Sequence, residues 1–228
     1  MTRPTPGGPT ASTEPPGSPS AGRRAERTGA ARPAPVAAAT RRRQILREAS
    51  RLFAERGFHG VGVDEIGAAV GISGPALYRH FPGKDAMLTE LLVGISTRLR
   101  DGGVRRTEQA AAEGLSPAGT LDVLIGGHID FALDDRALIT LHDRELDQLP
   151  PDERSRVRRL QREYVEIWVT VTRSAHPDLS EPDARAAVHA VFGLLNSTPH
   201  ISRHRTLPDR DATAALLHRL ARAAFAAA

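Results

Sequence analysis

The run SGPALYR, from Ser73 to Arg79, combines a hydroxyl, a proline, a methyl group and a guanidinium in one short segment. Ser73 can cap a helix by accepting backbone N–H bonds, and Pro75 then falls in the first turn, where a missing N–H is harmless. Gly74 and Pro75 offer no side-chain donor, whereas Arg79 presents a rigid fork of donors. These side chains can recognise another molecule by hydrogen bonds and van der Waals contact, but they do not form a catalytic site.

The apolar residues around this run predict how it is positioned. Ile66, Val70, Ile72 and Leu77 supply buried positions on two short helices, and Gly71 lies in the turn between them. This is the pattern of a helix-turn-helix, whose second helix enters the DNA major groove.

In that geometry Gly74, Pro75 and Ala76 face base edges, and the methyl of Ala76 can touch a thymine methyl. Direct readout then falls on Ser73, Arg79 and neighbours from the preceding helix. Further expected DNA contacts lie at the start of the first helix and before the second: Arg41, Arg43 and Gly62.

The segment from Ala76 to Leu88, which reads ALYRHFPGKDAML, resembles the DNA-binding domain of the tetracycline-repressor (TetR) family, and the similarity covers about residues 41–92. The resemblance implies that Tyr78, His80 and Lys84 hold phosphates. The alternatives are packing for Tyr78 and His80 and a solvated surface position for Lys84. Many relatives place Thr or Ser at position 62, and often Lys, Gly and Thr or Ser at positions 74–76, so this chain departs from the pattern on its recognition face.

Charge is distributed unevenly. Residues 1–40 carry five Arg and two Glu, residues 41–84 carry eight Lys or Arg and four acids, and a total of +4 leaves −3 for the remainder. A basic N-terminal part favours polyanion binding at that end. A solvated charged face explains the charge alone equally well.

Periodicity and breakers predict an all-α chain with an N-terminal three-helix DNA-binding domain and a larger helical domain. We expect a disordered, low-complexity, basic tail over 1–39, a helix-turn-helix domain over 40–84, and a ligand-binding and dimerisation domain over 85–228. The expected helices are 40–56, 63–70, 74–81, 83–101, 118–134, 135–148, 151–175, 181–200 and 209–227.

The last two expected helices are apolar around much of their circumference, which favours burial on more than one side. A large monomeric core would provide this, and so would a four-helix bundle between two copies. The family resemblance implies a homodimer through these helices. We expect Leu217 and Leu220 at its seam, with Val191 and Leu195 across from them.

The resemblance also implies a small-molecule cavity in the C-terminal domain. Aromatic walls with a few polar tips are typical of such cavities, and the candidates are His128, Phe131, His142, Tyr164, Trp168, Phe192 and Asn196. Each is also a plausible core or interface residue. Arg144, Arg162 and Arg173 nearby would suit an acyl-CoA or another amphipathic anion.

Other classes of protein find little support. Cys is absent, and no catalytic motif accompanies the cluster His142, Asp143 and Glu145 or the pair His200 and His204. We therefore expect no enzyme, cofactor or metal site. A DNA-architectural protein would have no use for the long non-basic helical half. No apolar run is long enough to span a bilayer and no secretory signal is present, so a cytoplasmic protein is expected.

Deletion of residues 1–39 tests the predicted tail. We expect a nearly unchanged melting temperature and modestly weaker DNA binding at low salt, because nothing in this segment can pack. Thermal denaturation and DNA titration provide the measurements. A large loss of operator discrimination would instead mean that the tail reads DNA, as minor-groove arms do.

Overall fold

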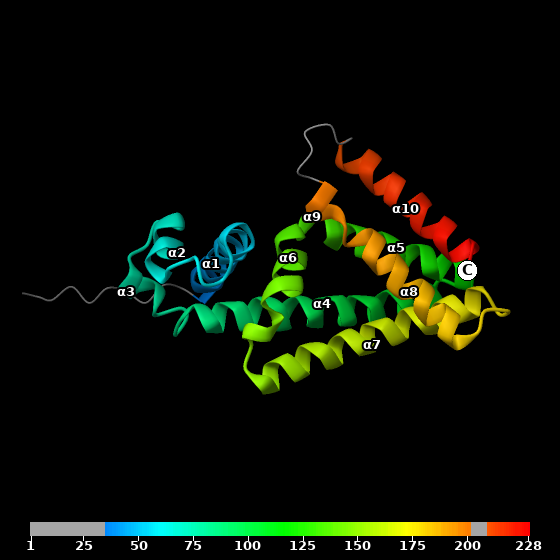
Figure 1. Cartoon of the computed structure of the whole chain (residues 1–228), viewed down its shortest axis with the longest axis horizontal. Coiled ribbons are helices and arrows are strands. Elements are labelled where there is room, and N and C mark those ends of the chain that lie inside the picture. The colour runs from blue at the N-terminus through cyan, green and yellow to red at the C-terminus, as the bar shows by residue number, and fades with distance from the viewer. Residues whose placement is uncertain (1–34, 202–208) are drawn as a thin grey trace, which may run out of the picture. The chain divides into compact units, whose positions relative to one another are not determined.

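The computed structural model describes residues 35–201 and 209–228, and every element within these ranges is helical, which confirms the all-α fold (Figure 1). In chain order the elements are α1 (Pro35–Arg56), α2 (Val63–Ala69), α3 (Gly74–Leu77), α4 (Lys84–Ala112), α5 (Pro117–Asp134), α6 (Arg136–Glu145), the 3-10 helix η1 (Leu146–Gln148), α7 (Pro151–Ala175), α8 (Glu181–Leu195), α9 (Thr198–Ile201) and α10 (Arg210–Ala226).

Helices α1 to α3 form a small head around one end of a hydrophobic core. Gly57 ends α1 with a φ of 78°, and Gly71 has a φ of 70° in the turn between α2 and α3. These are left-handed conformations that glycine adopts without steric cost. The core of the head is built from fully buried apolar side chains: Ile45, Phe53, Ile66, Leu77 and Phe81.

Helix α1 begins five residues earlier than predicted, at Pro35. Proline suits the first position of a helix and the alanines that follow favour its continuation. Thr40, where the helix was expected to start, therefore lies inside it. Of the predicted tail, residues 35–39 are helical and residues 1–34 lie outside the described residues. Helix α3 ends earlier than predicted, at Leu77, and a turn continues to His80.

Helix α4 continues eleven residues past its predicted end at Asp101, to Ala112. The pair Gly102–Gly103 suggested a break. In the structure a Cβ on Gly103 would lie 2.9 Å from a ring carbon of Tyr164 on α7. The glycine therefore stays helical and lets the two helices approach closely.

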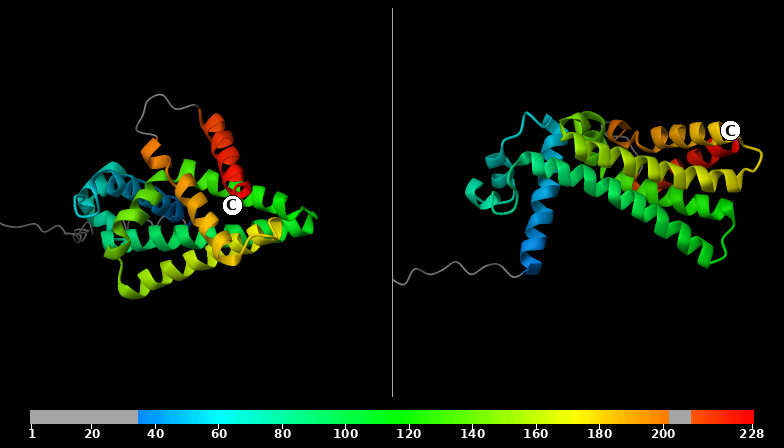
Figure 2. Two further views of the ribbon diagram at one scale, coloured as in Figure 1. Left: turned by 45° about the vertical axis from the view of Figure 1, so that its right-hand side comes forward. Right: turned by 90° about the horizontal axis from the view of Figure 1, so that it is seen from below.

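The C-terminal part is a layered bundle. Helix α7 runs beside α4 and α5, while α8 and α10 pack on α7 and α5 respectively and on each other (Figure 2). A second core, built around Trp168, joins α5, α7, α8 and α10. Helix α6 instead contacts α1 and α4 and contributes Leu138 and Leu141 to the core of the head.

The predicted helix 181–200 is divided in the structure. Helix α8 ends at Leu195, and α9 begins at Thr198. Pro199 has no N–H to bond the carbonyl of Leu195, so an uninterrupted helix would lose that bond.

The predicted dimer seam is wrong for three of its four residues. Leu217 is 4% exposed, and Val191 and Leu195 are fully buried within the chain's own core. Such side chains have no surface left to bury against a second copy. Leu220 differs, because 44% of its surface is exposed, and Leu216 beside it on α10 is 41% exposed.

This difference in burial predicts different costs of truncation. Leu217→Ala should lower the free energy of unfolding by about 2–5 kcal/mol, because it leaves a cavity in the second core. Leu115→Ala, at an exposed leucine between α4 and α5, should change it by less than about 0.5 kcal/mol. Denaturant titration of both variants measures the difference, and equal losses would contradict the assigned burial.

Candidate DNA interface and effector cavity

The start of α3 is arranged as the sequence predicts. The Oγ of Ser73 accepts a hydrogen bond from the N–H of Ala76 at 3.4 Å, which caps the helix. Pro75, Tyr78 and Arg79 are exposed, and Tyr78 has 55% of its surface accessible. Donors are thus available at the surface of the head where a helix-turn-helix meets DNA.

Gly74 requires a correction. It is buried against α2, and a Cβ at this position would lie 2.0 Å from Oδ1 of Asp64. Gly74 therefore allows close packing of α3 on α2 and is not free to face a base edge. The exposed Pro75 and the half-buried Ala76 remain the predicted contacts at this end of the helix.

Lys84 is part of the scaffold of the head. Its Nζ donates to the carbonyl oxygens of Phe58 at 3.0 Å and Val61 at 3.2 Å, and it lies 4.6 Å from the centroid of the Phe58 ring. An ammonium group has three N–H donors, so a phosphate contact by the third stays a prediction. His80 is half-buried in the turn after α3. Its contact with a phosphate also stays a prediction.

Three consecutive arginines on α1 have different partners. Arg41 donates to the carbonyl of Val70 at 3.1 Å, and Arg43 approaches Oγ1 of Thr40 at 3.5 Å. Arg42, which the sequence did not single out, pairs with Glu90 of α4 and lies 3.9 Å from the centroid of the Phe81 ring. No local signal distinguishes the arginine that turns inward. Gly62 is exposed and precedes α2 without a side-chain cap.

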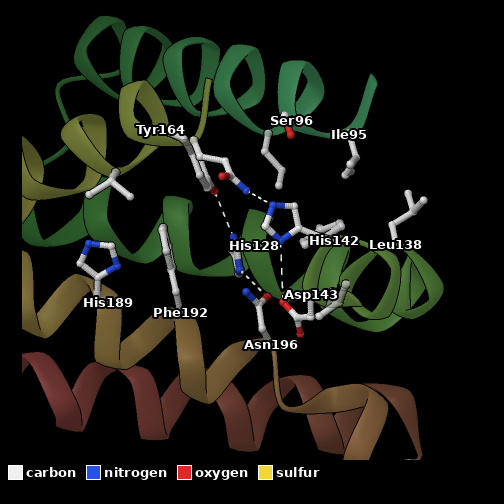
Figure 3. A pocket seen from close by; sticks show the side chains of 15 residues that line it. Ile95, Ser96, His128, Leu138, His142, Asp143, Tyr164, His189, Phe192 and Asn196 are labelled. Atoms are coloured by element: carbon white, nitrogen blue, oxygen red, sulfur yellow. Dashed lines mark hydrogen bonds and ion pairs between the residues drawn. The ribbon is translucent and has the colours of Figure 1, made fainter. Parts of the chain in front are cut away.

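The C-terminal part contains a cavity of about 260 Å³ between α4, α5, α6, α7 and α8 (Figure 3). Its wall is made of Ile95, Ser96, Leu99, His128, Phe131, Leu138, Ile139, His142, Asp143, Gln161, Tyr164, Val165, His189, Phe192 and Asn196. Six of the seven residues predicted from the sequence are in this wall. The seventh, Trp168, packs behind it, with its ring centroid 5.0 Å from that of Phe192.

A hydrogen-bonded row crosses the cavity wall (Figure 3). His128 is buried, with Nδ1 3.2 Å from the hydroxyl of Tyr164 and Nε2 3.0 Å from Oδ1 of Asn196. Since the amide oxygen only accepts, Nε2–H donates to Asn196, and Nδ1 accepts from Tyr164. Burial lowers the pKa of His128 to about 4 and raises the pKa of Tyr164 to about 12, so both groups are neutral near pH 7.

The second polar row begins at His142 on α6. Its Nε2 lies against the amide of Gln161, and its Nδ1 is 3.7 Å from the carboxylate of Asp143. Glu145 does not join them. This buried carboxylate turns to the head and accepts the N–H of Phe58 at 3.0 Å. The suggested cluster of His142, Asp143 and Glu145 is therefore not formed.

The arginines expected near the cavity are elsewhere. Arg144, Arg162 and Arg173 are exposed and do not line it.

No set of three His, Cys, Asp or Glu suited to a metal ion occurs among the described residues. His204 lies outside them. Within the described ranges, no helix is long and apolar enough to cross a membrane.

Helix α6 connects the cavity to the head. Leu138, Ile139, His142 and Asp143 on this helix line the cavity, while Leu138 also belongs to the core of the head. A change in cavity occupancy that moves α6 would therefore act directly on the head.

Comparisons with known proteins agree with this arrangement. Residues 45–91 match the family model described as bacterial regulatory proteins, tetR family, and residues 114–200 match that of the tetracyclin repressor-like C-terminal domain. The chain is 30% identical over 139 residues to the HTH-type transcriptional repressor KstR2 of Rhodococcus jostii. The aligned residues cover 60% of this chain and 66%, just under two thirds, of that repressor.

Solved structures share the fold. A TetR-family regulator from Bordetella parapertussis superposes with a TM-score of 0.66 at 23% identity, covering 79% of this chain and 93% of that one. The regulator FadR from Bacillus subtilis, solved in complex with stearoyl-CoA, superposes with a TM-score of 0.57 at 20% identity, covering 78% and 96%. The chain belongs to the TetR family of transcriptional regulators, a family of DNA-binding regulators and not of enzymes.

The only two tyrosines of the sequence provide a matched test of the interface. Tyr78→Phe should weaken binding to all DNA sequences by about 5–10-fold, the effect of one lost hydrogen bond, without changing stability. Tyr164→Phe removes the same hydroxyl inside the protein, so it should lower the melting temperature and leave DNA affinity unchanged. Fluorescence anisotropy and thermal denaturation measure both effects. Unchanged DNA affinity of Tyr78→Phe would remove Tyr78 from the interface.

Proposed function

We propose that this regulator is a ligand-responsive repressor that binds a pseudo-palindromic operator as a homodimer in the cytoplasm. A small amphipathic or acyl-CoA-like ligand then releases it from DNA. The observation that carries the proposal is the position of α6, which forms one wall of the cavity and packs into the core of the head.

The mechanism is linkage between two sites. A ligand shifts the equilibrium between two states only by the difference in its affinity for them. If the ligand-bound cavity holds α6 in a second position, the contact of Glu145 with the backbone of Phe58 moves with it. The head would then leave the orientation that fits DNA.

Two findings support the nature of the ligand. The wall contains aromatic and aliphatic side chains with a few polar groups, as small-molecule sites do. FadR of Bacillus subtilis, which has a similar fold, was solved in complex with stearoyl-CoA.

A symmetric dimer is supported by the exposed leucines of α10, Leu216 and Leu220. Family members typically form homodimers. The expected interface is formed by the segments 181–200 and 209–227, which contain α8, α9 and α10. Two heads could then engage half-sites about 34–36 Å apart, or a multiple of this spacing.

Selection of binding sites from random DNA tests the proposal. The enriched sites should be inverted repeats, because two heads related by a twofold axis read the same sequence in opposite directions. Enrichment of no sequence would contradict specific DNA binding, and enrichment of a single half-site would contradict the dimer.

Leu220→Arg should give a monomer, since a charge buried at an interface without a partner costs several kcal/mol. Operator affinity should fall by about 100-fold or more as the linkage of two heads is lost. Light scattering and anisotropy provide the measurements, and circular dichroism shows whether the helices remain. Leu115→Arg, an exposed leucine outside α10, is the matched control and should leave both properties unchanged.

A further inference from the structure

The charge of the cavity wall limits which ligand can enter. Among the described residues that line the cavity, none is Lys or Arg, and the only carboxylate is that of Asp143. An anionic group placed in this wall would have no Lys or Arg as a partner, and it would lie near the largely exposed carboxylate of Asp143. Burying an unpaired carboxylate is strongly unfavourable.

Arg106 does not supply the missing charge. Its guanidinium packs against the backbone of α5, where a Cβ on Gly127 would lie 2.2 Å from its Nε. It lies close enough to influence His128 and Tyr164, but it does not belong to the wall.

The inner row of hydrogen bonds shows what the wall does offer. His128 and Tyr164 are satisfied by each other, and Oδ1 of Asn196 accepts from His128. The Nδ2 group of Asn196 has no hydrogen-bond partner among the described residues. Its two N–H groups are donors at the cavity wall, and they match the oxygen of a carbonyl.

Flat rings lie beside this donor. The rings of Phe192 and His128 are stacked, with centroids 4.8 Å apart, and Tyr164 stacks on Phe192 at 5.5 Å. Figure 3 shows Phe192, His128 and Asn196 close together in the cavity wall. The site therefore combines apolar walls with a neutral donor.

We propose that the cavity takes an uncharged apolar group that carries a carbonyl, with the carbonyl oxygen bound by the Asn196 amide, and that it rejects free carboxylates. This inference rests on the proposed function and specifies its ligand. An acyl thioester satisfies the requirement, because its acyl chain and carbonyl are neutral. The corresponding free fatty acid, which is ionised at neutral pH, does not.

A matched pair of eight-carbon probes tests the inference: octanamide, which is neutral, and octanoate, which is anionic. Trp168 is the only tryptophan of the chain and packs directly behind Phe192 and Tyr164, so its fluorescence reports occupancy of the cavity. Octanamide should bind saturably to the full chain, and octanoate should bind at least about tenfold more weakly.

Two variants separate the charge from the hydrogen bond. Asp143→Asn should improve octanoate affinity by about 3–10-fold and leave octanamide unchanged, since it removes the like charge. Asp147→Asn is the control, because Asp147 is exposed on η1 and outside the cavity; it should change neither. Asn196→Asp keeps an acceptor for His128 but removes both donors, and it should weaken octanamide binding by about tenfold.

Octanoate binding as tightly as octanamide, octylamine binding more tightly than both, or no saturable binding of octanamide would each overturn the inference. So would undiminished octanamide binding by Asn196→Asp in a variant with native circular dichroism. Selection of operator sites without ligand is measured separately. Intact operator binding with any of these failures would reject the ligand class alone, whereas loss of specific DNA binding would reject the proposed function.

Discussion

The backbone of Phe58, bonded at both its N–H and its carbonyl, connects the DNA-binding head to the rest of the described chain. The carboxylate of Glu145 accepts its N–H, and the ammonium of Lys84 donates to its carbonyl. Glu145 is 8% exposed, and a buried charge without such partners would be costly. The loop after α1 is thus bound to α6 and to the first residue of α4, which are the two helices that enter the C-terminal part.

This arrangement gives the two hydrophobic cores different tasks. The core around Trp168 packs α5, α7, α8 and α10 and forms the back of the cavity. The core of the head extends through α6 and into the start of α7. Closely packed interiors respond to small changes in volume by shifting between discrete arrangements. The shared position of α6 is therefore where the proposed effect of a ligand on the head would act.

Local patterns in the sequence predicted part of this architecture. The bounds of α7 agree with the expected 151–175 because Pro150 precedes it, Pro151 occupies its first position and its apolar positions are periodic. The end of α4 was missed because two adjacent glycines resemble a break in a helix, and only the structure shows the ring of Tyr164 packed against Gly103.

The site divides in the same way. Aromatic and polar-tipped residues on amphipathic helices identified six of the fifteen residues of the cavity wall. The hydrogen bond of Glu145 to Phe58 joins positions 87 residues apart, and no local pattern contains that information.

The unbroken course of α4 has a further consequence for how small a movement can matter. With 29 residues and a rise of 1.5 Å per residue, the helix is about 43 Å long. It begins at the head and ends beyond the cavity. A tilt of about 5° would displace one end by about 4 Å relative to the other, by the length just derived. That displacement is comparable to the rise of one base pair of DNA, about 3.4 Å, so a small rigid rotation of α4 would move the head by a distance that matters for the proposed contact with DNA.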